Sequence, residues 1–242
     1  MINSVRNTVL AIINKNNYGY ISPSDFNLFA KQAQLDLFDE YFYSYNQQIN
    51  KENSRISGTG YADLKKGIEE VIDTFSVTQS LSQNANNIFF LPSASTTGSD
   101  YYLLNKVLCS TGGVYKGEAE KVGQSKITLL NSSILTTPSI TYPAYSQEAS
   151  SITIYPSTYN TFGDVQAQYI RYPKDPKWTF TSISNGDPIF DQSQPDFQDF
   201  ELPIDDGNDL VAKILQYAGI SIREGDVVKF GQMEEQIQNQ QQ

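Results

Sequence analysis

The stretch ISPSDFNLFAKQAQLDLFDEYFYSYNQQINK, residues 21–51, is the longest regular pattern in the chain and predicts one long amphipathic helix. Ser22 suits an N-cap, and Pro23 suits the first helical position, where a missing N–H costs nothing. Apolar residues then recur in helical steps of three and four: Phe26, Phe29, Ala30, Ala33, Leu37, Tyr41, Tyr45 and Ile49. Two interpretations fit: a long core helix of an ordinary domain, or a strut on which a subunit stacks against its neighbours.

Further helical patterns lie on both sides of this stretch and near the end of the chain. Residues 3–15 and about 60–75 each carry apolar side chains at helical spacing. A fourth pattern follows Asp209, with a predicted buried face of Leu210, Val211, Ile214, Leu215 and Ala218. A last helix is predicted over about 225–237. Residues 1–75 and 191–242 are therefore predicted to form the two parts of one helical bundle.

Residues 76–190 have a different composition, in which Ser, Thr, Tyr, Pro and Gly dominate. Short segments such as 88–91, 101–109, 152–155 and 165–172 are typical of strands, and residues 117–131 fit a short helix. Three Tyr-Pro pairs are expected at strand ends, because proline lacks a ladder donor. The predicted fold class is α+β, a bundle of N- and C-terminal helices with an inserted small antiparallel β domain.

Composition and charge exclude several classes of function. Lys and Arg total 17 against 27 Asp and Glu, so the net charge is −10 and no basic footprint for tight phosphate binding is present. The chain has no histidine and one cysteine, Cys109, which excludes Ser-His-Asp and Cys-His nucleophiles, His-based zinc sites and Cys-rich metal clusters. No phosphate-cradling glycine motif occurs. We predict no enzyme activity, no cofactor and no metal.

The sequence also predicts where the protein is made. No signal-peptide pattern precedes the first helix, and the longest clean apolar run is Ile88–Leu91, far short of a membrane span. We expect a protein of the reducing cytoplasm, or of a particle that is assembled there.

Acidic residues gather between 187 and 209 and leave two chemical alternatives open. Asp196 and Glu201 are an example of the carboxylate pair that a glycosidase needs. Residues 205–209, Asp-Asp-Gly-Asn-Asp, offer oxygen ligands for calcium, but no Glu completes an EF-hand loop. A solvated loop that caps the following helix explains the same residues without any ligand.

Aromatic residues suggest contacts with other proteins. Tyrosine and tryptophan are enriched at the centres of interfaces, so Tyr172 and Trp178 are candidate interface residues. A place in the core explains them equally well.

Several segments resemble structural proteins of tailed bacteriophages, in particular those of crAss-like phages. They are PSITYPAY (138–145), ITIYP (152–156), YIRYPKDPKW (169–178), FELP (200–203) and LVAKILQYAGI (210–220). The resemblance implies a head–tail connector, a neck ring or adaptor protein similar to tail tubular protein A, whose fold is a helical bundle with a β insertion.

The resemblance also implies a role and partners. It implies a ring of twelve subunits in the virion neck, in contact with the portal and other neck and tail rings, with genomic DNA passing through without tight binding. An acidic wall fits that passage. We expect a C-terminal helix with Phe230, Met233 and Ile237 to dock into the portal or a neighbouring ring. Two alternatives remain: a tail accessory or receptor-binding module with a Tyr-rich β domain, and a carboxylate-based cell-wall hydrolase.

Overall fold

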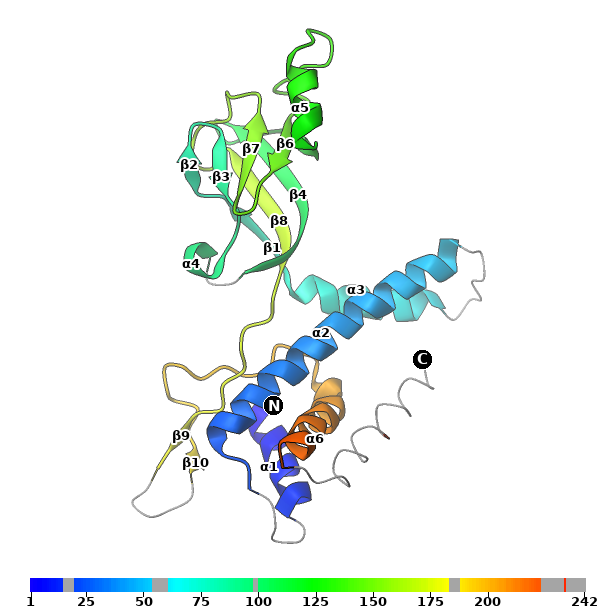
Figure 1. Ribbon diagram of the computed structural model, residues 1–242, viewed down its shortest axis with the longest axis vertical. Helices are drawn as coiled ribbons and strands as arrows, with labels where there is room; N and C mark the ends of the chain where they lie inside the picture. Colours follow the sequence, from blue (N-terminus) through cyan, green and yellow to red (C-terminus); the bar gives the residue numbers. More distant parts are fainter. Residues whose placement is uncertain (15–19, 54–60, 98–99, 183–187, 223–232, 234–242) are drawn as a thin grey trace. The chain divides into compact units, whose positions relative to one another are not determined.

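The chain folds into two compact units, each with its own core. The structure is a computed structural model and describes residues 1–14, 20–53, 61–97, 100–182, 188–222 and 233. Unit 1 comprises Met1–Val71 and Pro173–Gln242, and unit 2 comprises Ile72–Tyr172. Figure 1 shows the elements of both units. Residues 173–182 and 188–190, at the end of the predicted β region, thus belong to unit 1.

Unit 1 contains α1 (Ile2–Ile13), α2 (Pro23–Asn53) and α6 (Gly207–Ile222), and most of α3 (Tyr61–Thr74). The predicted long helix is confirmed by α2. Its start has the predicted cap, because the Asp25 N–H donates to Ser22 Oγ at 3.1 Å. Half of the predicted stripe is buried, namely Phe26, Ala30, Ala33 and Leu37, and its other members, Phe29, Tyr41, Tyr45 and Ile49, are half-buried. Phe38, which the stripe did not include, is buried as well.

Helix α6 packs against both α1 and α2 and supplies the other side of the unit 1 core (Figure 1). Leu210, Ile214, Leu215 and Ala218 of its predicted face are buried, whereas Val211 is half-buried. After unit 2, the chain re-enters unit 1 at Pro173 as an extended segment. This segment contains β9 (Phe180–Thr181), β10 (Ile189–Phe190) and the short 3-10 helix η2 (Ile204–Asp206). Phe200 and Leu202 of this segment complete the core.

Unit 2 is built on one eight-stranded sheet in the order β1-β8-β4-β5-β6-β7-β3-β2. Its strands are β1 (Ser76–Ser80), β2 (Gln83–Ala85), β3 (Ile88–Phe90), β4 (Tyr101–Thr111), β5 (Val114–Lys121), β6 (Ala144–Gln147), β7 (Ser151–Tyr155) and β8 (Val165–Arg171). Strands β5 and β6 run parallel, and the other neighbours run antiparallel. A parallel pair needs a crossover, which α5 (Gln124–Asn131) and the loop after it provide.

The sheet is curled into a half-barrel, and the connection between its two edge strands shows why. β1 and β2 lie at opposite edges of the sheet, yet only Leu81 and Ser82 separate them in the chain. The Leu81 N–H donates to Val165 O at 3.0 Å, and the Phe90 N–H donates to Ser82 O at 2.9 Å. This short link therefore touches β8 on one side and β3 on the other, which a flat sheet does not allow.

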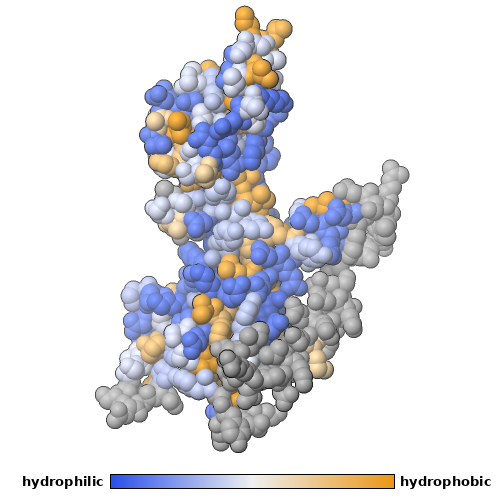
Figure 2. All heavy atoms as spheres, in the orientation of Figure 1, coloured by the Kyte–Doolittle hydropathy of each residue, from blue (hydrophilic) through white to orange (hydrophobic). Residues whose placement is uncertain are grey.

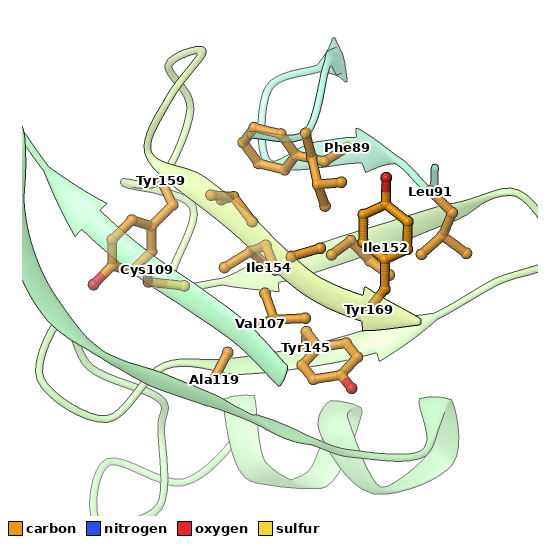
Figure 3. Close-up of a cluster of buried hydrophobic side chains, with 13 residues drawn as sticks. Phe89, Leu91, Val107, Cys109, Ala119, Tyr145, Ile152, Ile154, Tyr159 and Tyr169 are labelled. Atoms are coloured by element: carbon orange, nitrogen blue, oxygen red, sulfur yellow. The ribbon is translucent and has the colours of Figure 1, made fainter. Parts of the chain in front are cut away.

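The inside of the curl holds the core of unit 2. Its buried residues come from six of the eight strands and the segments beside them (Figure 3): Leu81, Phe89, Leu91, Val107, Cys109, Ala119, Tyr145, Ile152, Ile154, Tyr159, Val165, Ala167 and Tyr169. Cys109, the one cysteine of the chain, lies fully buried in this core as a free thiol. Its burial raises the pKa of the thiol to about 12, so Cys109 is unreactive at neutral pH.

The predicted fold class is wrong. The β region is neither small nor purely antiparallel, since it is a large mixed sheet with a core of its own, and the protein is not a helical bundle with an insertion. The predicted strands 152–155 and 165–172 exist as β7 and β8. They follow each other in the chain but are not neighbours in the sheet, since β7 pairs with β6 and β3, and β8 pairs with β1 and β4. The predicted helix 117–131 is half strand, because β5 continues to Lys121 before α5 begins.

Candidate interaction surface

Exposed apolar side chains gather at one end of unit 2. We call this the tip end; it contains the β4–β5 turn and the start of β8. The opposite base end contains the starts of β1 and β4 and the end of β8. At or near the tip end lie Val114, Tyr115, Leu129, Ile134, Leu135, Ile140, Tyr142 and Phe162, all more than a third exposed. Figure 2 shows hydrophobic residues at this end of the unit, at the top of the view.

The most exposed of these residues form the turn after α5. Ile134 is 99% exposed and Leu135 is 95% exposed. Hydrogen bonds of the flanking residues hold the turn: the Thr137 N–H donates to Ser133 O at 3.0 Å, and Thr136 Oγ1 donates to Leu130 O at 3.3 Å. Because the polar neighbours bond inward to the backbone, the two aliphatic side chains point to solvent. We call Ile134 and Leu135 the aliphatic tip.

The segment behind the aliphatic tip is tied to the sheet. Tyr159 is fully buried, and its hydroxyl donates to Ile140 O at 2.6 Å. The Glu120 N–H donates to Pro143 O at 3.0 Å. Gly117 allows the close approach, because a Cβ there would lie 2.8 Å from Thr141 O. The tip is therefore carried by a segment with a fixed path across β5.

Described residues of unit 2 line a cavity at each of two places. One, of about 500 Å³, is at the base end and is lined by Phe90, Leu91, Pro92, Ser93, Ser95, Asp100, Tyr101, Ala149 and Ser150. The other, of about 560 Å³, lies beside α5 between β5 and the returning loop. Its lining includes Glu118, Glu120 and Lys126, so it is more polar than the first.

Trp178, a predicted interface residue, lies in the core of unit 1. It is 2% exposed, and the Arg6 guanidinium lies 3.7 Å from its ring centroid. The indole N–H donates to Asn3 Oδ1 at 3.0 Å, and the Trp178 backbone N–H donates to Asn27 Oδ1 at 2.8 Å. Trp178 thus joins the extended segment to α1 and α2, and of the two interpretations of this residue the structure supports the core.

The other predicted interface residues have different positions. Tyr172 is 38% exposed and lies edge-on to Tyr102, with ring centroids 5.2 Å apart. Met233 is 62% exposed. Phe230 and Ile237 lie outside the described residues, so the predicted docking helix is not described as a whole.

The acidic residues between 188 and 209 hold the extended segment in place. Asp191 accepts hydrogen bonds from Thr181, Ser193 and Gln194, which lower its pKa. Asp199 accepts from the backbone N–H of Ile2 at 2.7 Å and of Phe200 at 2.8 Å, and its carboxylate also pairs with the Met1 amino group.

The two carboxylates that sequence analysis offered as a catalytic pair each have a partner in the segment after Pro173. Asp196 forms an ion pair with Lys177, and Glu201 accepts the Lys174 N–H at 2.8 Å. Asp206 of the calcium alternative accepts the Tyr41 hydroxyl at 2.7 Å. Among the described residues, no cluster of three or more His, Cys, Asp or Glu has the arrangement of a metal site.

The Asp206–Tyr41 contact gives a pH-dependent prediction. Burial raises the pKa of Asp206 against the opposing effect of the Tyr41 hydrogen bond, and nearby Asp209 adds to the rise. The unfolded chain then loses this proton at a lower pH than the folded chain, so stability falls as pH rises through that interval. Asp206→Asn is expected to raise the urea midpoint at about pH 7 and to give little gain at about pH 3.

Urea unfolding at both pH values measures the effect. Asp73→Asn is the control, because Asp73 is exposed on α3 and is not one of the charges that raise the pKa of Asp206. An equal gain for Asp206→Asn at both pH values would contradict the assignment.

Charge is distributed unequally between the units. Unit 2 has six Asp and Glu against five Lys and Arg, a net charge of −1, so the other −9 of the chain's −10 belongs to unit 1.

Among the described helices, none has the length and apolar content that crossing a bilayer requires.

Comparison with known proteins adds no family. No family model matches the chain, and the search of curated proteins gave no match.

Sequence reasoning missed the aliphatic tip. The only signal is an Ile-Leu pair between hydroxyl residues, SSILTT at 132–137. Such a pair has neither strand nor helix periodicity, so it predicts no element.

Proposed function

We propose that this chain is a structural virion protein, a subunit of a ring in the neck of a tailed bacteriophage. The ring joins the portal to the tail and forms part of the DNA channel. The observation that carries the proposal is the aliphatic tip, because an ordered turn that presents two exposed aliphatic residues suits contact with another protein. The resemblance of segments 138–145, 152–156, 169–178, 200–203 and 210–220 to phage connector proteins supplies the setting.

The fold itself does not support the proposal in the form that the resemblance implied. A bundle with a small β insertion was expected, and the chain has a large curled sheet instead. The proposal therefore depends on the surface and on the segments that carry the resemblance.

The charge distribution supports a role beside DNA without tight binding. Unit 1 carries a net charge of −9, and a like-charged wall lets phosphates slide past rather than adhere. The proposed partners are further copies of the chain, twelve in the ring by resemblance, together with the portal and other neck rings. Met233, which is exposed, belongs to the C-terminal segment that we propose docks into one of these partners.

A reconstruction of an intact particle tests the function. Copies of this chain are expected to form a closed ring between the capsid and the tail. In the reconstructed density, unit 1 is recognised by its long helices and unit 2 by its curled sheet. Copies found at the tail periphery, or in the capsid shell, would contradict the proposal. Turnover of a cell-wall polymer by the purified chain would contradict it as well.

A further inference from the structure

The cavity beside α5 has a lining of mixed chemistry. Its floor is the outer face of β5. Ala119 belongs to the core inside the curl, so its two neighbours, Glu118 and Glu120, face outward. One wall is α5 with Lys126 and Leu130, and the other wall is the returning loop. The volume of about 560 Å³ falls in the range of roughly 300–1,000 Å³ for small-molecule sites.

Backbone hydrogen bonds and a small core hold the walls of this cavity. The Glu120 N–H donates to Pro143 O at 3.0 Å. The Val122 N–H donates to Tyr145 O at 2.8 Å, so the end of the loop is bound to the floor. Helix α5 is anchored by Ile127, which packs with Val122 in a buried cluster. The cavity therefore has an ordered frame.

An exposed aromatic side chain lies at the wall of the cavity. Tyr142 belongs to the lining and is 79% exposed. A closed turn holds it in place, because the Tyr142 N–H donates to Ser139 Oγ at 3.2 Å and the Ser139 N–H donates to Tyr142 O at 3.1 Å. Its ring thus offers a flat apolar surface beside polar groups.

The charges of the lining favour a neutral ligand. Glu118 already pairs with Lys106, at 3.1 Å. Among the described residues, neither Glu120 nor Lys126 has an ion-pair partner, and their opposite charges offset each other. A neutral ligand that both donates and accepts hydrogen bonds finds a partner in each of them. Three further lining residues add hydroxyl groups: Thr136, Thr137 and Ser139.

Two common modes of peptide binding do not fit this cavity. An added peptide strand needs a free sheet edge, but β4 pairs with one side of β5, while β6 and the segment before it lie along the other. An amphipathic helix needs an apolar groove, whereas Glu118, Glu120 and Lys126 line this one. The lining instead matches a molecule that combines many hydroxyl groups with an apolar face, which is the chemistry of a sugar ring.

We propose that the cavity beside α5 is a binding site for a neutral carbohydrate. The apolar face of a sugar ring packs against the ring of Tyr142. The Glu120 carboxylate accepts hydrogen bonds from sugar hydroxyl groups, and the Lys126 amino group donates to them. The site belongs to unit 2 alone and does not depend on the proposed neck role.

Ligand-observed NMR with the full-length chain tests the site. The neutral probes are chitotetraose, cellotetraose and maltotetraose, each at about 10 mM, and the charged probes are spermine and inorganic phosphate. At least one tetrasaccharide is expected to receive saturation transfer from the protein, and neither charged probe is expected to displace it. Absence of transfer to all of the tetrasaccharides would overturn the proposal, as would displacement by spermine or phosphate.

Two substitutions locate the binding, which isothermal titration calorimetry measures. Tyr142→Ala is expected to weaken it about 5- to 10-fold, because the sugar loses its apolar surface. Glu120→Gln retains the shape of the side chain but replaces a charged acceptor, and it is expected to weaken binding about 10-fold. Both side chains are exposed, so neither change touches a core.

Tyr115→Ala and Glu148→Gln are the matched controls, because both side chains are exposed in unit 2 and lie outside the lining of the cavity. Both controls are expected to bind as the unchanged chain does. Binding that survives Tyr142→Ala and Glu120→Gln, or that falls equally in a variant and its control, would overturn the proposal. A neck ring whose chains bind none of these sugars overturns the site alone, and a sugar-binding chain found away from the neck retains the site.

Discussion

Trp178→Ala is expected to lower the free energy of unfolding of unit 1 by about 3–5 kcal/mol, the range for removing a large buried aromatic side chain. Trp178 is 2% exposed and packs between elements distant in sequence: its ring lies under Arg6 of α1 and within 6 Å of Phe180 and Phe190, at centroid distances of 5.7 and 5.9 Å. The substitution leaves a cavity, removes the cation–π contact and leaves Asn3 without its indole partner.

Denaturant unfolding followed by far-UV circular dichroism measures the effect, because the long helices belong to unit 1. Trp178→Phe retains most of the apolar volume and is expected to cost clearly less than the alanine variant. Phe162→Ala is the surface control, since Phe162 is 68% exposed, and it is expected to change stability by less than about 0.5 kcal/mol. A loss below about 1 kcal/mol for Trp178→Ala would contradict the role of Trp178 in joining the extended segment to α1 and α2.

The helices of unit 1 were predictable because their signals are local. A cap at Ser22 and apolar residues at helical spacing define α2 without reference to the rest of the chain. The same holds for α6, whose apolar residues from Leu210 onward follow one face. Local signals do not identify partners, however, and the sequence left open whether Trp178 belongs to a core or an interface.

The sheet was not predictable because its key features are not local. Strand β1, SVTQS, is polar and has no residue that is fully buried, so it lacks the alternation that marks a strand. Strand β5, VYKGEAEK, is rich in residues that favour helices, yet ladders to β4 and β6 hold it extended. Alternation indicates which face of a strand is buried but not which strand lies beside it, so the curled mixed sheet was missed.

The candidate surface was missed for a related reason. An exposed Ile-Leu pair acquires meaning only when the structure shows that hydrogen bonds order the turn and that neighbouring apolar residues share the same end of the unit. The acidic stretch shows the reverse case. In the sequence its carboxylates suggested catalysis or metal binding. In the structure Asp191, Asp196 and Asp199 bind Thr181, Lys177 and the Ile2 N–H, and these contacts hold the extended segment in place.

Tyr159→Ala is the second large effect, with an expected loss of about 3–5 kcal/mol in the stability of unit 2. Tyr159 is fully buried in the core of the curl, and its hydroxyl is the link from that core to the segment behind the aliphatic tip. Tyr159→Phe isolates the hydroxyl: it retains the ring and leaves Ile140 O without its donor, at an expected cost of about 0.5–1.5 kcal/mol.

Amide hydrogen exchange distinguishes the two contributions of Tyr159. In Tyr159→Phe, the Glu120 amide, which donates to Pro143 O, is expected to exchange faster because the segment 138–143 is held less firmly, while amides in the centre of β4 and β8 change little. Tyr115→Phe is the control, since Tyr115 is 61% exposed at the same end. Unchanged exchange at Glu120 would mean that the segment keeps its path without the hydroxyl.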